Sequence, residues 1–374
     1  MYLITILLLS VFAYIEVFNR ETIEKYKVPF AFFCFIFLVI HDGFRWETGS
    51  DWTAYLQAFE NFWNDNNGSY TGAFESGYML LMGGIRLLTE DYSVYLVIHA
   101  LLFYSIFFYV IFKISDYPFI SLLLFYMLTV PFMGMNRQFL AMAIFAISLL
   151  YQQKGEWKMA LLLILLATLF HRTAFLALPT LLLGHKIQRR YILIGYILCL
   201  IITMSSIINT FGNELALLTG TDSVSGEKIE IYTNQDTETN FMITILSFLR
   251  KMIWLVLLFL FDKKVDKGCN ERKYTLLLNL YIISTMSYLV FNGTVLQIIV
   301  ARGLLYYNLA EMFIIPYAIS IFKNNYGKLF LMLLLSLYCT INIYKGFSNY
   351  GEGNDYFEPY KGLFINTNYE RKYI

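Results

Sequence analysis

Charge is the scarcest ingredient of this 374-residue chain, because only 15% of its residues are Asp, Glu, Lys or Arg. A soluble domain of ordinary composition carries about 25%. Apolar residues fill the gap and make up 58% of the chain. They run in long blocks and do not alternate with polar residues. This pattern excludes a soluble globular protein and predicts a membrane protein.

Cysteine is also scarce, and the four cysteines show neither metal-ligand spacing nor the pattern of a disulfide framework. The formal net charge of +1 gives no reason to expect a nucleic-acid partner. The first apolar run lacks the basic start and the small-residue cleavage site of a secretory signal, so we expect it to be a membrane span. We also find no inverted internal repeat of the kind that marks many transporters.

Long uncharged runs supply the positive evidence for membrane spans. Residues 93–112 and 191–211 each extend for about 20 residues without a charge, which is enough to cross a bilayer as a helix. We therefore predict an all-α, polytopic integral membrane protein that forms a single membrane domain over residues 1–374. Counting the apolar runs gives about twelve transmembrane helices.

Lysine and arginine orient the chain, since basic residues stay on the cytoplasmic side of a membrane. More than half of the 28 Lys and Arg residues lie in six short connectors: 19–27, 113–116, 153–158, 185–190, 262–274 and 323–328. Placing these connectors inside puts the N-terminus outside. It also exposes four longer segments on the outer face: 45–92, 212–240, 292–302 and 345–374.

Two apolar segments do not fit the count of full crossings. Segment 76–88 spans only about 20 Å as a helix, so we expect a re-entrant or interfacial helix within the outer loop 45–92, after an amphipathic helix that begins at Asp51. Segment 158–184 consists of two short apolar halves around His171 and Arg172, which predicts either two tilted crossings or a hairpin. Segment 212–240 is expected to be a polar outer loop.

Arginines gather on the predicted outer side, where the positive-inside rule disfavours them. A guanidinium stays charged and binds phosphate with two parallel hydrogen bonds, so several arginines at the membrane edge suit a lipid-linked pyrophosphate. The alternative for any single one is that it extends to lipid headgroups. The candidate pyrophosphate ligands are Arg45, Arg137, Arg172, Arg250 and Arg302.

Three further residues are candidates for acid–base catalysis, namely His171, Asp51 and Glu75, because each can accept a proton from an attacking hydroxyl. Tyr55 and Gln138 are candidate substrate-binding residues. Structural roles are the alternatives: Asp51 as a helix N-cap and His171 as an interfacial hydrogen-bonding group.

Other charged residues have simpler interpretations. Glu311 is a candidate partner of Arg250 or Arg302, and Arg86 and Lys251 are candidate interfacial anchors.

Five stretches in order resemble the EpsG-like branch of the Wzy-type polysaccharide polymerases: "RWETGSDWTAYLQAF", "FESGYMLLMGGI", "MNRQFLAMAIFAISLL", "LATLFHRTAFLALP" and "ARGLLYYNLAEMFIIP". The likeness covers residues 45 to about 318, and the "RQ" helix followed by the "H-x-[TS]-A" helix is its most specific part. The extra arginine after His171 departs from a plain "HSA". The match supports seven site positions: Arg45, Asp51, Glu75, Arg137, Gln138, His171 and Arg302.

The resemblance implies a multi-span glycosyltransferase with a GT-C-like fold. Such an enzyme joins oligosaccharide repeat units of O-antigen or exopolysaccharide, each carried on undecaprenyl pyrophosphate, at the periplasmic or outer face of the bacterial inner membrane. It implies no metal and no other cofactor. A chain-length regulator is a possible protein partner, and the same lipid-linked oligosaccharide serves as donor and acceptor.

Competing functions remain at this stage. A flippase for the same lipid-linked unit predicts charges spread through the bilayer and an internal repeat. An O-antigen ligase predicts the same arginines with a larger late periplasmic loop. A sugar acyltransferase and an intramembrane protease each need a paired catalytic set, and the sequence shows no convincing example.

Overall fold

Helices dominate the computed structural model, which describes residues 1–65, 67–72, 74–205, 207–211, 241–263, 271–292, 294, 296–348, 350 and 355–371. Among these residues, β-structure is limited to isolated bridges that join Arg45, Gly362 and Ile365. The prediction of an all-α fold is confirmed. The predicted polar loop 212–240 lies outside the described residues.

The chain divides into two compact units, which we describe separately. Unit 1 comprises residues 1–152, 156–175 and 322–374, and unit 2 comprises residues 153–155 and 176–321. The prediction of a single membrane domain over residues 1–374 stays a prediction.

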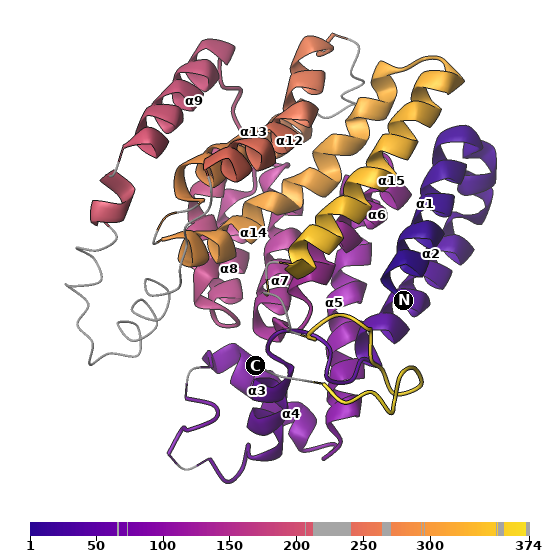
Figure 1. Ribbon diagram of the computed structural model, residues 1–374, viewed down its shortest axis with the longest axis vertical. Coiled ribbons are helices and arrows are strands. Elements are labelled where there is room, and N and C mark those ends of the chain that lie inside the picture. The colour runs from indigo at the N-terminus through magenta and orange to yellow at the C-terminus, as the bar shows by residue number, and fades with distance from the viewer. Residues whose placement is uncertain are drawn as a thin grey trace. The chain divides into compact units, whose positions relative to one another are not determined.

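Unit 1 is a bundle of apolar helices with two short helices at one end (Figure 1). Helix α7 packs on α5 and α8, α2 packs on α5, and α1 packs on α2, α6 and α15. The elements of unit 1 are α1 (Tyr2–Phe18), α2 (Arg20–Gly43), α3 (Trp52–Glu60), α4 (Ser76–Arg86), α5 (Tyr92–Ile114), α6 (Pro118–Thr129), η1 (Val130–Phe132), α7 (Asn136–Gln152), α8 (Trp157–Thr168) and α15 (Asn325–Ser348).

The two ends of unit 1 differ in chemistry. Helices α3 and α4 and the C-terminal segment 355–371 lie at the end where α2 stops and α5 begins (Figure 1). At the other end, the Lys27 ammonium of connector 19–27 lies 5.5 Å from the Phe112 ring, next to connector 113–116. Within this unit, the segments predicted outside and these two basic connectors are therefore separated.

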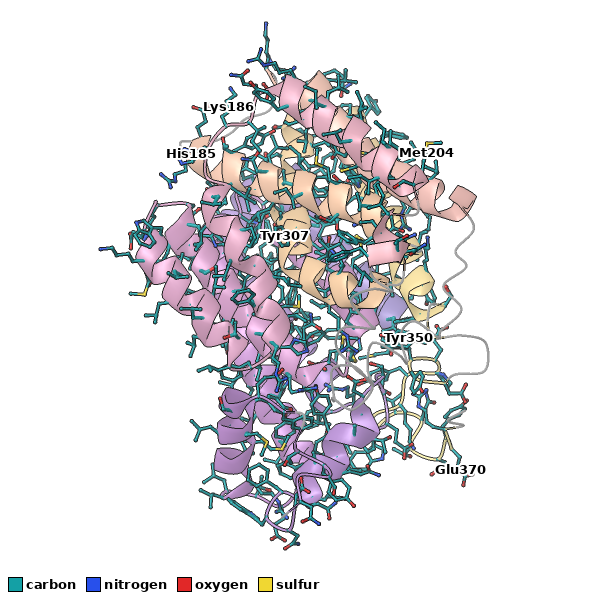
Figure 2. The ribbon with its side chains drawn as sticks, turned by 90° about the vertical axis from the view of Figure 1, so that its left-hand side faces the viewer. His185, Lys186, Met204, Tyr307, Tyr350 and Glu370 are labelled. Carbon is teal, nitrogen blue, oxygen red and sulfur yellow. The ribbon has the colours of Figure 1, made fainter. Side chains whose placement is uncertain are left out.

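Unit 2 is built around α13 (Glu271–Phe291), which packs on α9 (Arg189–Met204), α12 (Phe241–Leu260) and α14 (Gln297–Ile314). Helix α14 continues into the 3₁₀ helix η3 (Ile315–Ile321). In Figure 2, His185 and Lys186 lie near the start of α9 and Met204 marks its other end. The 3₁₀ helix η2 (Arg172–Leu182) crosses the boundary between the units.

Four of the described helices are long and apolar enough to cross a membrane: Tyr92–Ile114, Glu271–Phe291, Val300–Ile321 and Asn325–Ser348. Shorter apolar helices accompany them, including α1 and the segment Pro118–Phe132. Helix α9 leaves large apolar side chains exposed along its length, among them Leu193, Ile197 and Ile201. Exposed apolar faces of this kind are expected of helices that lie against lipid. The chain thus has the helices of a multi-pass membrane protein, and the count of about twelve spans remains a prediction.

The two segments that the sequence analysis treats as irregular are short in the structure. Helix α4 has 11 residues, as expected for the re-entrant or interfacial segment 76–88. Segment 158–184 forms α8, a break at residues 169–171, and then the 11-residue η2. Since 3₁₀ runs longer than 3–4 residues are uncommon, η2 is a distinctive element directly after His171.

A buried carboxylate joins α1 to α6 within unit 1. The Glu16 side chain is 6% exposed and accepts hydrogen bonds from the Phe119 and Ile120 backbone N–H groups at 3.0–3.2 Å. These N–H groups belong to the first turn of α6 and have no partner within the helix. A carboxylate at a helix N-terminus is further stabilised by the helix dipole.

Replacing Glu16 with Ala is expected to lower the thermal stability of the purified protein, since it leaves buried N–H groups unsatisfied at about 1–3 kcal/mol each. Glu24→Ala is the matched control, because Glu24 is exposed and pairs only with Arg20 one helical turn away. Thermal unfolding in detergent measures the difference. Equal melting temperatures for the two variants would show that the α1–α6 contact is not stabilising.

Candidate functional site

Arg137 is held near the start of α7 by groups from three other segments of unit 1. Its Nη1 donates to Glu75 Oε2 at 2.8 Å, and its Nε donates to the Tyr55 hydroxyl at 3.2 Å. The guanidinium carbon lies 4.4 Å from the centre of the Phe74 ring. The Arg137 side chain is 16% exposed and that of Glu75 8%, so the ion pair lies in a sheltered place at the molecular surface.

The second oxygen of Glu75 is bound by the backbone. Oε1 accepts from the Arg172 N–H at 3.1 Å, and that N–H belongs to the first residue of η2. The carboxylate therefore bridges α7 and η2 with one oxygen on each. We call the Arg137 guanidinium and the Arg172 N–H, with Tyr55 and Phe74 beside the guanidinium, the anion seat. Charged hydrogen bonds of this kind are the strong ones.

A glycine fixes where Glu75 lies. The Gly77 and Tyr78 N–H groups donate to the Leu169 carbonyl at 2.8 and 3.3 Å, which joins the start of α4 to the end of α8. A Cβ on Gly77 would lie 2.8 Å from that carbonyl oxygen, so only glycine permits this approach. The motif "FESGY" thus places Glu75 beside the residues that follow α8.

Asn136 fixes the N-terminal end of α7 from inside the unit. Its side-chain oxygen accepts from Arg45 Nη2 at 2.8 Å, and its backbone oxygen accepts from His99 Nε2 at 3.0 Å. Arg45 also donates to the Asp42 carboxylate and to the Asp42 carbonyl. The Arg45 side chain is only 1% exposed.

This placement differs from the sequence prediction for Arg45, which made it a pyrophosphate ligand. The guanidinium is enclosed and contacts the protein's own Asp42 and Asn136. Arg45 thus positions the residue before Arg137, and a direct contact with a phosphate would require it to leave both partners.

Two glycines bring the turn before α3 against the turn before α7. Gly49 and Gly134 both adopt positive φ angles, +110° and +106°, which other residues rarely adopt. A Cβ on Gly49 would lie 2.4 Å from the Met133 carbonyl oxygen, and one on Gly134 would lie 3.0 Å from the Ser50 nitrogen. The two backbones therefore touch directly, and this contact sets Asp51 and Arg137 at fixed positions.

His171 has a defined protonation pattern. Its Nδ1 accepts a hydrogen bond from the Thr173 backbone N–H at 3.3 Å and lies 2.7 Å from the Thr173 hydroxyl. Because a backbone N–H can only donate, Nδ1 carries the lone pair, and the neutral ring carries its proton on Nε2. In this tautomer His171 offers a donor from Nε2 and does not offer a basic nitrogen there.

Tyr55 and Asp51 stand at the start of α3, with Asp51 at the N-cap position. The Asp51 side chain makes no capping hydrogen bond to the helix, so the alternative of a simple N-cap finds no support there. Burial raises the pKa of the Tyr55 hydroxyl, which the nearby Asp51 carboxylate raises further and Arg137 partly offsets. Tyr55 thus stays neutral and accepts from Arg137.

The remaining predicted site residues of unit 1 take different positions. Gln138 is buried in α7 at 2% exposure. The Arg172 side chain is exposed, and the part of Arg172 that enters the anion seat is its backbone N–H. Arg86, treated as an interfacial anchor, instead joins α4 to α3 through a 3.1 Å hydrogen bond to the Phe59 carbonyl.

Arg250 and Arg302 belong to unit 2, on α12 and α14. Their role as phosphate ligands stays a prediction. The ion pair that the structure gives Glu311 in this unit is with Lys251, at 3.7 Å, and the Lys251 side chain is 14% exposed. Lys251 is therefore an internal residue of unit 2, whereas the sequence analysis treated it as an interfacial anchor.

The sequence analysis missed the role of the C-terminal segment 355–371, whose ends are marked by Tyr350 and Glu370 in Figure 2. Its backbone pairs with the turn after α2: Trp46 N–H donates to the Lys361 carbonyl at 3.0 Å, and Gly49 N–H donates to the Tyr356 carbonyl at 2.8 Å. The Lys361 ammonium also pairs with Glu47. No local signal marks this contact, because it joins residues more than 300 positions apart.

The arrangement suits the binding and release of an oxyanion. A guanidinium and a backbone N–H converge on one anionic group, and the histidine before that N–H carries a donor. Within the described parts of the chain, no three His, Cys, Asp or Glu side chains gather in a metal-binding arrangement.

Gly49→Ala is expected to disturb the site, because an L-residue in the left-handed region costs about 1–2 kcal/mol and the new methyl group also overlaps the Met133 carbonyl. Gly84→Ala is the control, since a Cβ on Gly84 of α4 meets nothing within 4 Å. Thermal unfolding and binding of a lipid-linked pyrophosphate measure both effects. Wild-type values for Gly49→Ala would contradict the backbone contact between the two turns.

Comparison with known proteins gives one clear assignment. No curated protein and no solved structure matches the chain. A family model described as the EpsG family matches residues 28–362, a range that includes every residue of the anion seat. This match covers most of the chain and confirms the resemblance seen in the sequence. The chain belongs to the EpsG family, which is associated with exopolysaccharide biosynthesis.

Proposed function

We propose that this protein is a membrane glycosyltransferase that polymerises oligosaccharide repeat units carried on undecaprenyl pyrophosphate. The observation that carries the proposal is the anion seat, in which Arg137 and the Arg172 N–H converge on one oxyanion in a member of the EpsG family. The seat belongs to unit 1 and lies at the end of that unit predicted to face outward, toward the periplasm or the exterior.

Arg137 suits the donor's pyrophosphate for three reasons. It is charged at any physiological pH, it is partly exposed, and its position is set by Tyr55 and Phe74. Binding a phosphate there leaves the polyprenyl tail to lie along the apolar helices. Because the guanidinium stabilises negative charge that grows on the pyrophosphate as it leaves, it accelerates transfer as well as binding.

The reaction that this site supports is a direct displacement. A hydroxyl oxygen of the acceptor sugar forms a bond to the anomeric carbon of the donor glycan, and the bond from that carbon to the pyrophosphate oxygen breaks. The electron pair leaves with the lipid pyrophosphate, and the hydroxyl proton passes to a base. A single displacement inverts the anomeric configuration. Neither a metal nor another cofactor takes part in the reaction as proposed.

Asp51 is the base that we favour among the three candidates. Glu75 has both oxygens engaged with Arg137 and Arg172. The neutral ring of His171 carries its proton on Nε2, so this nitrogen donates toward the leaving group and does not accept. Asp51 lies close enough to influence the Tyr55 hydroxyl, beside the seat, and is half-buried.

A flippase or an O-antigen ligase is the alternative. Both would handle the same lipid-linked unit, and both would use arginines near the membrane edge. The three functions differ in what a deletion leaves on the cell surface, which the next experiment measures. A chain-length regulator acting on the polymerase is a proposed partner.

Deleting the gene and restoring single variants tests the proposal. We expect the deletion to leave single repeat units where the wild type shows a ladder of surface polysaccharide on a gel. Wild type and Arg20→Ala should restore the ladder, because Arg20 is exposed and lies away from the seat. Arg137→Ala should not restore it, since the donor phosphate loses its main ligand.

Two outcomes contradict the proposal in different ways. Loss of all repeat units from the surface of the deletion strain would favour the flippase or the ligase. A normal ladder from Arg137→Ala would show that this arginine does not bind the donor.

Asp51→Asn is expected to lower kcat by about 100-fold or more while changing KM little, because general base catalysis typically contributes 10²–10⁴-fold. The measurement is transfer between two lipid-linked oligosaccharides by the purified enzyme. His171→Gln serves as the comparison, since Gln keeps a hydrogen-bond donor. A larger loss of kcat for His171→Gln than for Asp51→Asn would assign the base to His171.

A further inference from the structure

Glu75 is bound as a ligand would be bound. Its carboxylate places one oxygen on the Arg137 guanidinium and the other on the Arg172 N–H. Two oxygens on one atom, each facing a separate donor, are also what a phosphate group presents. The carboxylate thus occupies the place that the donor phosphate requires, and the chemical species its oxygens stand in for is a phosphate of the pyrophosphate group.

The start of α4 does not depend on this carboxylate. Glu75 is the N-cap residue of α4 with an extended backbone (φ −77°, ψ 150°), yet its side chain makes no capping bond. The Leu169 carbonyl accepts from the Gly77 and Tyr78 N–H groups instead. The side chain of Glu75 is therefore free of any duty to its own helix, and it can turn away without unwinding α4.

The other contacts of Arg137 also survive the departure of Glu75. The Tyr55 hydroxyl continues to accept from Arg137 Nε, and the Phe74 ring continues to face the guanidinium. These two groups orient the arginine without adding charge. The seat consequently keeps its shape when one anion replaces another.

Electrostatics forbids both anions from sharing the seat. A phosphate placed on Arg137 beside a retained Glu75 would put two negative charges on one guanidinium in a sheltered place, where like charges repel strongly. Arg137 is the one cation to which the printed contacts link Glu75. Binding of the phosphate must therefore displace the carboxylate.

We propose that Glu75 holds the phosphate position of the anion seat in the resting protein and is displaced by the pyrophosphate of the lipid-linked donor. This inference rests on the proposed function and deepens it by naming the donor phosphate as the competitor of Glu75. The exchange swaps one oxyanion for another on the same donors and needs no covalent step. It keeps the site charge-balanced when no donor is bound and makes donor binding a competition.

Glu75→Gln tests the competition. The amide keeps the size of the side chain and removes its charge, so the donor phosphate no longer has to break an ion pair. We expect binding of undecaprenyl pyrophosphate to the purified full-length protein to become roughly tenfold tighter, the difference between a charged and a neutral hydrogen bond. Microscale thermophoresis in detergent measures the Kd, and equal melting temperatures confirm that both proteins are folded.

Matched controls isolate the seat. Glu24→Gln removes an exposed glutamate that also pairs with an arginine, Arg20, and should leave the Kd unchanged. The double variant Glu75→Gln/Arg137→Ala should lose the gain, since the phosphate ligand is gone. Undecaprenol, which has no phosphate, should show no difference between wild type and Glu75→Gln.

Several results would overturn the inference. Unchanged or weaker binding of undecaprenyl pyrophosphate by Glu75→Gln would show that Glu75 does not compete with the donor. Tighter binding of inorganic pyrophosphate alone would assign the seat to free pyrophosphate and not to a lipid headgroup.

The inference and the proposed function fail separately. If the wild-type gene restores no ladder but Glu75→Gln binds the lipid more tightly, the competition stands and the polymerase assignment falls. If wild type restores the ladder and Glu75→Gln binds as wild type does, only the competition falls.

Discussion

An arginine at the start of an apolar helix needs a partner for its charge, and in this protein the pair formed by Arg137 and Glu75 meets that requirement. The pair also decides what the site can do. A neutral pair is stable at a membrane edge, whereas an uncompensated guanidinium there is costly. Because Glu75 is matched by chemistry to the phosphate that we propose as ligand, the interaction that stabilises the empty site is the one that the donor replaces.

The surrounding structure serves to hold this pair in place. Arg45 and His99 fix Asn136 from the buried side, and the glycine contact between Gly49 and Gly134 fixes the turns on the other side. Gly77 sets the position of Glu75 against α8. The C-terminal segment 355–371 covers the turn that carries Arg45. Rigid backbone contacts of this kind keep a polar site precise inside an otherwise apolar bundle.

The sequence predicted the helical fold and four members of the site cluster, Tyr55, Glu75, Arg137 and Arg172, because charged and polar residues stand out against apolar runs. It did not predict that Arg45 is enclosed, since its partner Asp42 lies within the end of an apolar run and resembles a loop residue. It did not predict the packing of segment 355–371, because contacts across most of the chain leave no local pattern. The tautomer of His171 depends on a turn geometry that only coordinates reveal.

The central claim is that the anion seat binds the donor's pyrophosphate, and the most direct test is a cryo-EM structure of the protein with undecaprenyl pyrophosphate bound. The account predicts a phosphate group within hydrogen-bond distance of the Arg137 guanidinium and the Arg172 N–H, with the Glu75 carboxylate turned away from both. A phosphate bound elsewhere, with the Arg137–Glu75 pair intact at its present 2.8 Å, would contradict it.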